Sequence, residues 1–346
     1  MRWTVVLIFG QQIVQKVVMV KQRGHIALIT PAAPGSRAGN RATASRWAGL
    51  LRPLGYRVSI HLSEDAPTGR APDLILALHA WRSHAAVLAW RRAHPDSPLV
   101  VVLTGTDVYR FQVSEPETVY ASLDAADALI GLHDCLEEDL PERYWPKLHV
   151  VHQSAEPLPP GVPQAVRRTV DILVAGHLRE EKDSLRAAMA VRDLPLDSRL
   201  RVVQLGGALS EDWAEAAEDE ARRNPRYRWL GDQPRWRVRQ WMGRARAMVI
   251  SSRMEGGANV VSEACVAGLP IIASDIAGNR GLLGEDYVGY YPMGNTVALR
   301  ECLLRIERDP VWRRRLRDQV MARAPLFQPE AEQRALGQII ERVTSA

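Results

Sequence analysis

From His25 onward, short apolar runs alternate with longer amphipathic stretches along the chain. In the first half the runs are "HIALIT", "YRVSI", "DLILALH", "LVVVLTG", "ALIGLH" and "LHVVHQ", which are typical of strands buried on both faces. Between several of them, "RATASRWAGLLRPLG", "SHAAVLAWRRAH" and "DCLEEDLPERYW" carry apolar residues at helical spacing. Strand and helix alternating in this way predict a parallel sheet with helices on both of its faces.

The alternation stops at residues 154–164, "SAEPLPPGVPQ", where four prolines favour a stiff linker. It then restarts with "VDILVAGHL", "RLRVVQLGG", "YRWLG", "AMVIS" and "PIIASD" as strands, and with helices near 183–194, 210–224, 235–245 and 259–268. The chain has 346 residues, above the roughly 250 to 300 residues at which a single core stops growing. We therefore expect two doubly wound α/β domains joined by a hinge.

The expected domain limits follow from these patterns. They are a loose extension over 1–23, a first domain over 24–153, the linker over 154–165, a second domain over 166–325, and a closing helix over 326–346. The extension's apolar run is broken by glutamines and Lys16, so it is too polar to span a bilayer, and Met19 is an alternative start.

Composition excludes several function classes. The net charge is +5, but the arginines are spread through the chain among Asp and Glu, which is typical of solvated helix faces and not of a nucleic-acid surface. The three cysteines share no metal or redox spacing, which predicts a protein of the reducing cytoplasm without a disulfide framework. We expect small-molecule ligands, no stable membrane insertion and no nucleic-acid partner.

A loop at residues 253–260, "RMEGGANV", lies between a predicted strand and a predicted helix. In doubly wound sheets, ligands bind outside the carboxyl ends of the strands, where this loop begins. Its glycines let a ligand approach the backbone, and the amides that open the helix attract anions. Glu255 and Glu263 flank this cradle, and carboxylates accept hydrogen bonds from vicinal hydroxyls. The alternative interpretation is that both acids are merely solvated.

The pattern resembles the donor site of the family-4 glycosyltransferases, which have the GT-B fold of two doubly wound Rossmann-like domains facing each other across a cleft. The resemblance implies that Glu263 binds the ribose of a nucleotide and that Glu255 contacts the transferred sugar. It also implies sugar and phosphate contacts from the backbone between the two acids. The donor-binding residues expected there are Gly256, Gly257, Ala258, Asn259 and Val260.

A second matching segment is "VAGHLREEKD", residues 174–183, after the first strand of the second domain. In the same family a basic pair in this loop holds the diphosphate. The resemblance implies this role for Lys182, with Arg179 and His177 as further candidates, although His177 stands where arginine is usual. The catalytic residues expected are thus Lys182, Arg179 and Glu255. No Asp-x-Asp motif is present to hold a metal, so we expect neither a metal ion nor another cofactor.

The first domain should hold the acceptor. Its first loop, "TPAAPGSRAGNRATASRW" at 30–47, offers bare amides, a helix start and two guanidinium groups, a combination that favours a compact dianion. A glycine-rich turn with solvated arginines is the structural alternative. The acceptor-binding residues expected are Gly35, Ser36, Arg37, Gly39, Asn40 and Arg41, together with Thr106 and Asp107 of "LTGTDVYR".

Together with "LHAWRS" at 78–83, these segments resemble a narrower group, the selenosugar synthases (SenB-type) of selenoneine biosynthesis. The resemblance implies transfer of a sugar from a UDP-sugar, typically UDP-N-acetylglucosamine, to selenophosphate. Asp107 and His79 are possible orienting groups.

Three other functions are alternatives to selenosugar synthesis. The first is an ordinary glycosyltransferase acting on a hydroxyl of a glycan or lipid, and the second is a sugar-nucleotide binder without chemistry. A nicotinamide oxidoreductase is disfavoured, because the G-x-G-x-x-G fingerprint does not follow the first predicted strand.

Overall fold

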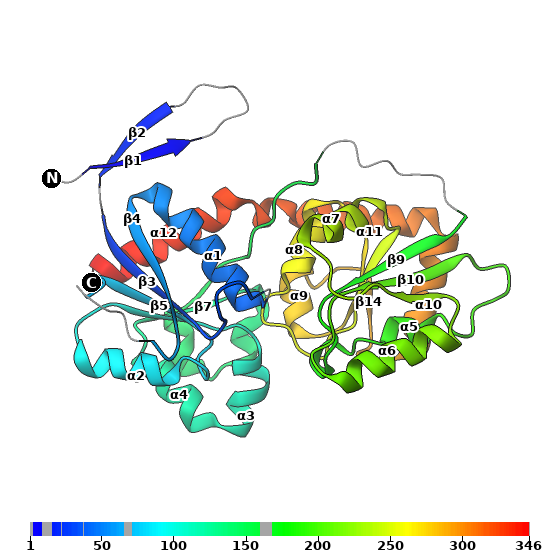
Figure 1. Cartoon of the computed structure of the whole chain (residues 1–346), viewed down its shortest axis with the longest axis horizontal. Helices are drawn as coiled ribbons and strands as arrows, with labels where there is room; N and C mark the ends of the chain where they lie inside the picture. The colour runs from blue at the N-terminus through cyan, green and yellow to red at the C-terminus, as the bar shows by residue number, and fades with distance from the viewer. Residues whose placement is uncertain are drawn as a thin grey trace. The chain divides into compact units, whose positions relative to one another are not determined.

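The structure is a computed structural model that describes residues 3–8, 16–21, 23–36, 38–65, 71–159 and 168–345. The chain folds into two compact units (Figure 1). The first comprises Met1–Gln153 and returns with Pro329–Ala346, and the second comprises Ser154–Gln328. Each unit is described separately below.

A six-stranded parallel sheet forms the centre of the first unit, in the order β4-β3-β5-β6-β7-β8. Its strands are β3 (Gly24–Thr30), β4 (Tyr56–Leu62), β5 (Leu74–Leu78), β6 (Leu99–Val102), β7 (Ala128–Gly131) and β8 (Leu148–Val150). Its helices are α1 (Gly39–Leu51), η1 (Arg52–Leu54), α2 (His84–Ala93), η2 (Asp107–Phe111), α3 (Gln112–Ser114), α4 (Pro116–Ala125), η3 (Asp134–Asp139), η4 (Glu142–Lys147) and α12 (Pro329–Ser345).

Both faces of this sheet are covered, which explains the unbroken apolar runs in its strands. Successive side chains of a strand point to opposite faces. Accordingly, Ile26 and Leu28 of β3 pack in one cluster with α1 and α12, while Ala27 and Ile29 pack in the other cluster with α2 and α4.

Helix α12 packs against α1 of the first unit and is fixed there by a buried carboxylate (Figure 1). Glu332 accepts hydrogen bonds from Trp47 Nε1 at 2.6 Å and from Arg46 Nε at 2.9 Å, and its side chain is fully buried. The last helix of the chain therefore completes the core of the unit in which the chain began.

Replacing Glu332 with alanine should lower the free energy of unfolding by about 3 kcal/mol, since it leaves Arg46 and Trp47 without their shared buried acceptor. Urea unfolding followed by circular dichroism measures the change. Glu330→Ala, an exposed position on the same helix, is the control and should change the stability by less than about 0.5 kcal/mol. Equal stability of Glu332→Ala and wild type would contradict this role.

The second unit repeats the architecture with the order β11-β10-β9-β12-β13-β14, again parallel throughout. Its strands are β9 (Val170–Ala175), β10 (Leu200–Leu205), β11 (Tyr227–Trp229), β12 (Ala247–Ile250), β13 (Ile271–Ser274) and β14 (Tyr290–Tyr291). Its helices are η5 (Glu180–Lys182), α5 (Arg186–Ala190), α6 (Glu211–Arg223), α7 (Arg235–Arg244), α8 (Asn259–Val266), α9 (Ala277–Leu283), α10 (Thr296–Arg308), α11 (Pro310–Arg323) and η6 (Ala324–Phe327).

The predicted α/β class is confirmed, and every predicted strand is present. The prediction of one helix over 134–145 was wrong. This segment forms the short 3₁₀ turns η3 and η4, because Pro141 separates them and Pro146 has no N–H to continue a helical ladder. The sequence also did not predict that β1 (Trp3–Ile8) and β2 (Lys16–Lys21) would pair antiparallel as a separate two-stranded sheet. Of the linker, residues 160–165 lie outside the described residues.

No helix among the described residues has both the length and the apolar character needed to cross a bilayer.

Candidate active site

The loop that carries Lys182 begins at the carboxyl end of β9. Leu178 forms a bridge to Ala208, which ties this loop to the one that follows β10. After the turn η5, Asp183 has a left-handed backbone (φ 44°), which reverses the chain. The Ser184 hydroxyl then closes the loop, since it accepts a hydrogen bond from Arg179 N at 3.0 Å and donates to Arg179 O at 3.1 Å.

Glu255 lies in the loop after β12 and forms an ion pair with Lys182 through its Oε1 atom. Both side chains are largely buried, with 7% of the Glu255 side chain and 21% of the Lys182 side chain exposed. The Ser251 hydroxyl joins the two loops by donating to Lys182 O at 3.0 Å and to Asp183 O at 3.1 Å. A carboxylate and an ammonium group from two different loops are thus held in direct contact.

These loops enclose a pocket at the carboxyl ends of three neighbouring strands, β9, β10 and β12. It is lined by Val174, Ala175, Gly176, His177, Lys182, Ser184, Gln204, Ile250, Ser251 and Ser252. This is where an open α/β sheet binds its ligands. Gly206 permits the close approach of the β9 and β10 loops, because a Cβ atom there would lie 2.0 Å from Gly176 O.

Helix α8 begins directly after the glycine pair. Its N-cap residue, Ala258, has no side chain that can cap the helix, so the polarity at this end comes from the backbone. Gly256 and Ala258 are buried, whereas Gly257, Asn259 and Val260 are partly exposed.

Glu263 lies one turn into α8. Its side chain is 12% exposed, and its Oε1 atom lies 3.2 Å from Nη2 of the Arg235 guanidinium group. Arg235 opens α7 and is itself 64% exposed.

The two remaining donor-side predictions lie in the Lys182 loop. His177 lines the pocket. The Arg179 side chain is 39% exposed, and its Nε atom lies 3.8 Å from Glu181 Oε2. Lys182 and His177 therefore line one pocket, Glu255 contacts Lys182 from the loop after β12, and Arg179 lies in the same loop as Lys182.

The predicted acceptor residues lie on two loops of the first unit. Gly35 (φ 79°) and Ser36 are exposed in the loop after β3, and Gly39, Asn40 and Arg41 form the first turn of α1. Ser36 Oγ accepts a hydrogen bond from Ala38 N at 3.1 Å. Arg37 lies outside the described residues. Thr106 and Asp107 follow β6, and β5 separates β6 from β3 in the sheet.

Asp107 is fully buried and holds a loop in place. Its carboxylate accepts hydrogen bonds from the backbone amides of Ala80 (3.0 Å), Thr104 (3.0 Å) and Gly105 (2.7 Å). This use of the carboxylate argues against the predicted direct contact between Asp107 and an acceptor, which stays a prediction for Thr106.

Neighbouring His79 has a left-handed backbone (φ 75°), a strained conformation for a residue with a side chain. Its Nδ1 accepts from Arg82 N at 3.1 Å, which leaves Nε2 to donate to Thr106 Oγ1 at 2.9 Å. Burial lowers the pKa of His79, although the charge of Asp107 opposes this effect.

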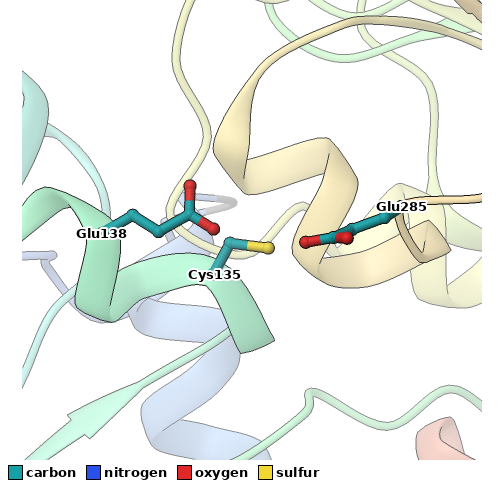
Figure 2. A group of neighbouring side chains, drawn as sticks. All are labelled: Cys135, Glu138 and Glu285. Atoms are coloured by element: carbon teal, nitrogen blue, oxygen red, sulfur yellow. The ribbon is translucent and has the colours of Figure 1, made fainter.

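Three side chains that could ligate a metal are drawn in Figure 2. Cys135 and Glu138 come from η3 in the first unit, and Glu285 follows α9 in the second. Among the described residues neither unit alone supplies all three, and a structural zinc site takes four protein ligands. This group therefore supports no metal assignment.

Residues 164–322 match the family model described as "Glycosyl transferases group 1". The matched residues all lie within the second unit, so it is the second unit that is similar to this family. The pocket, the Lys182–Glu255 ion pair and α8 all lie within the matched residues. Comparison with curated protein sequences returned no match.

Solved structures show that the whole chain has the GT-B fold of glycosyltransferases. HepE from Anabaena, solved with UDP and glucose, is 15% identical, with a TM-score of 0.73 over 94% of this chain and 100% of HepE. Sucrose-phosphate synthase from Thermosynechococcus elongatus is 18% identical, with a TM-score of 0.75 over 93% of this chain and 100% of that one. A Rickettsia africae glycosyltransferase is 13% identical, with a TM-score of 0.69 over 92% of this chain and 98% of that one.

Sequence reasoning missed several polar residues of this pocket, namely Ser184, Gln204, Ser251 and Ser252. The signal for two of them was present, since Ser251 ends the predicted strand at 247–251 and Ser252 directly follows it. The other two are part of ordinary strand and loop sequence, and only the tertiary fold places them at the pocket.

Proposed function

We propose that this chain is a glycosyltransferase that takes its sugar from a UDP-sugar bound on the second unit. The observation that carries the proposal is the Lys182–Glu255 pair, held at a pocket of a domain that matches the group 1 glycosyltransferases. A fixed ammonium group stabilises the negative charge that develops on a departing diphosphate. The presence of UDP and glucose in HepE, which has the same fold, agrees with this ligand class.

In this proposal the sugar nucleotide spans the loop between the two acids. Glu263 accepts hydrogen bonds from the ribose hydroxyls, while Glu255 and the backbone at Gly256, Gly257 and Ala258 contact the sugar. Lys182 faces the diphosphate, with Arg179 and His177 as further polar groups of the same loop. Backbone amides at the start of α8 add donors for the phosphates.

For the acceptor we propose selenophosphate, bound by the first unit. Its selenium attacks the anomeric carbon of the sugar, the bond from that carbon to the diphosphate oxygen breaks, and UDP leaves with the bonding electrons. Water then cleaves the selenium–phosphorus bond to release phosphate and the selenosugar. N-acetylglucosamine is the sugar that the sequence resemblance implies.

The hydrogen bonds in the loops after β5 and β6 support an acceptor that needs no general base. The oxygens of Asp107 are bonded to backbone amides, and both nitrogens of His79 are engaged. A sugar or lipid hydroxyl usually needs a base to remove its proton, whereas the selenium of selenophosphate is already ionised. Because Thr106 Oγ1 accepts from His79, its own hydrogen can be donated to an anion.

The test is to incubate the purified chain with UDP-N-acetylglucosamine, with and without selenophosphate, and to identify products by mass spectrometry. We expect UDP, phosphate and a selenosugar only when both substrates are present. Transfer to a glycan or lipid hydroxyl, with none to selenophosphate, would overturn the proposed acceptor but keep the donor. Failure to bind UDP in calorimetry would overturn the donor assignment as well.

A further inference from the structure

We propose that Ser252 and Gly278 are positioning residues that seat Glu255 against Lys182. This inference rests on the proposed function for its kinetic readout, but the contacts behind it do not. Neither residue belongs to the predicted site, and they come from different segments, Ser252 after β12 and Gly278 in α9. They act on different parts of Glu255, one on its carboxylate and the other on its backbone.

The carboxylate is held by a buried hydrogen-bond chain. Ser252 Oγ donates to Glu255 Oε1 at 2.5 Å, the same oxygen that pairs with Lys182. The carbonyl of Ser252 in turn accepts from Ser274 Oγ at 2.6 Å. Because the Ser252 hydroxyl donates a hydrogen bond to this oxygen, it limits the rotation of the Glu255 carboxylate.

Helix α9 anchors the far end of this chain. Asn279 Nδ2 donates to Ser274 O at 2.9 Å and to Ser274 Oγ at 3.1 Å. All of these side chains are buried, with exposed fractions of 1% for Ser252 and 0% for both Ser274 and Asn279. Hydrogen bonds in such a setting are electrostatically stronger than in water, so the chain fixes a single arrangement.

Gly278 fixes the backbone of the same loop by its lack of a side chain. A Cβ atom at this position would lie 2.1 Å from Glu255 O and 2.9 Å from Glu255 Cβ. Contacts this short do not occur, and the nearest atom belongs to the backbone, so any side chain at 278 must push the Glu255 loop away from α9. The close contact with α9 therefore fixes where the backbone of Glu255 can lie.

The hydroxyl is tested with Ser252→Ala against Ser262→Ala. Ser262 is a matched control because it is 1% exposed, and its hydroxyl has no hydrogen-bond partner in the part of the chain that the structure describes. We expect Ser252→Ala to lower kcat for UDP-sugar turnover by about 10-fold or more, with the Kd of UDP within about 2-fold of wild type. UDP lacks the sugar that Glu255 is proposed to contact, so a merely destabilised site would weaken UDP as well.

The backbone contact is tested with Gly278→Ala against Gly49→Ala. Gly49 lies in α1, where an added Cβ meets nothing within 4 Å. Displacing a catalytic group by about 1 Å costs on the order of 100-fold in rate, so kcat for Gly278→Ala should fall by about that factor while the Kd of UDP is retained. Wild-type kcat in both Ser252→Ala and Gly278→Ala would overturn the inference.

Crystals of the unliganded variants separate this inference from the proposed function. In Gly278→Ala the Glu255 backbone should move away from α9, and in Ser252→Ala the carboxylate should rotate away from its present position. An unmoved Glu255 in both structures would refute the positioning role even if the enzyme transfers sugar. Movement of Glu255 in a protein that binds no UDP would support the positioning role and refute the function.

Discussion

Replacing Lys182 with methionine should lower kcat for UDP-sugar turnover by about 10² to 10³-fold while the Kd of UDP changes less than tenfold. Methionine keeps much of the side-chain volume but removes the ammonium group. In the proposed reaction this group acts mainly on charge that develops as the bond to the diphosphate breaks, so its loss raises the barrier more than it weakens ground-state binding. Steady-state kinetics and calorimetry with UDP measure the two effects separately.

The ion pair with Glu255 requires a further control for this experiment. Lys182→Met leaves the carboxylate of Glu255 buried without its cation, which can destabilise the fold independently of catalysis. The double variant Lys182→Met with Glu255→Gln removes both charges, and thermal unfolding of the single and double variants measures their coupling. If the double variant recovered wild-type kcat, Lys182 would be a structural partner of Glu255 and not a catalytic group.

Replacing Glu263 with alanine should raise the Kd of UDP by about 10- to 100-fold. A hydrogen bond to a charged acceptor contributes about 1.5 to 3 kcal/mol, and each 1.4 kcal/mol is tenfold in affinity. Because the ribose is present in both UDP and the UDP-sugar, both should weaken by the same factor, unlike the effect expected for changes around Glu255. Isothermal titration of each ligand makes the comparison.

Arg235 provides the matched control for Glu263. It contacts the same carboxylate but is largely exposed, so Arg235→Ala leaves the ribose acceptor in place and should change the Kd of UDP only about twofold. A Kd of UDP unchanged in Glu263→Ala would place the ribose elsewhere and undo the donor assignment.

The fold was predictable from the sequence because the central strands of both sheets are apolar runs buried on both faces, a pattern that few other structures share. The loops that bear Lys182 and Glu255 were also found, since in a parallel sheet the ligand side is the side where strands end. The apolar spacing at 134–145 predicted a helix, but the prolines in and next to this segment do not permit a continuous one.

The residues that hold the Glu255 loop in place were not predictable from the sequence in the same way. Ser274 and Gly278 come close to the Glu255 loop only because β12, β13 and α9 pack together, and nothing in their local sequence marks them as its neighbours. Asp107 illustrates a different error, in which the sequence suggests a ligand-binding residue that has a structural role. Its position after a strand suggested a ligand contact, but the fold uses its carboxylate to gather three backbone amides.

The return of α12 to the first unit makes the second unit a covalent insertion between two segments of the first. Residues 154–328 leave the first unit after β8 and rejoin it before α12, so both chain ends belong to one unit. A break in the first of these two connections would leave the pieces joined by the second connection and by the burial of Glu332. Severing the two units completely would take a second cut, near Gln328, in addition to the first.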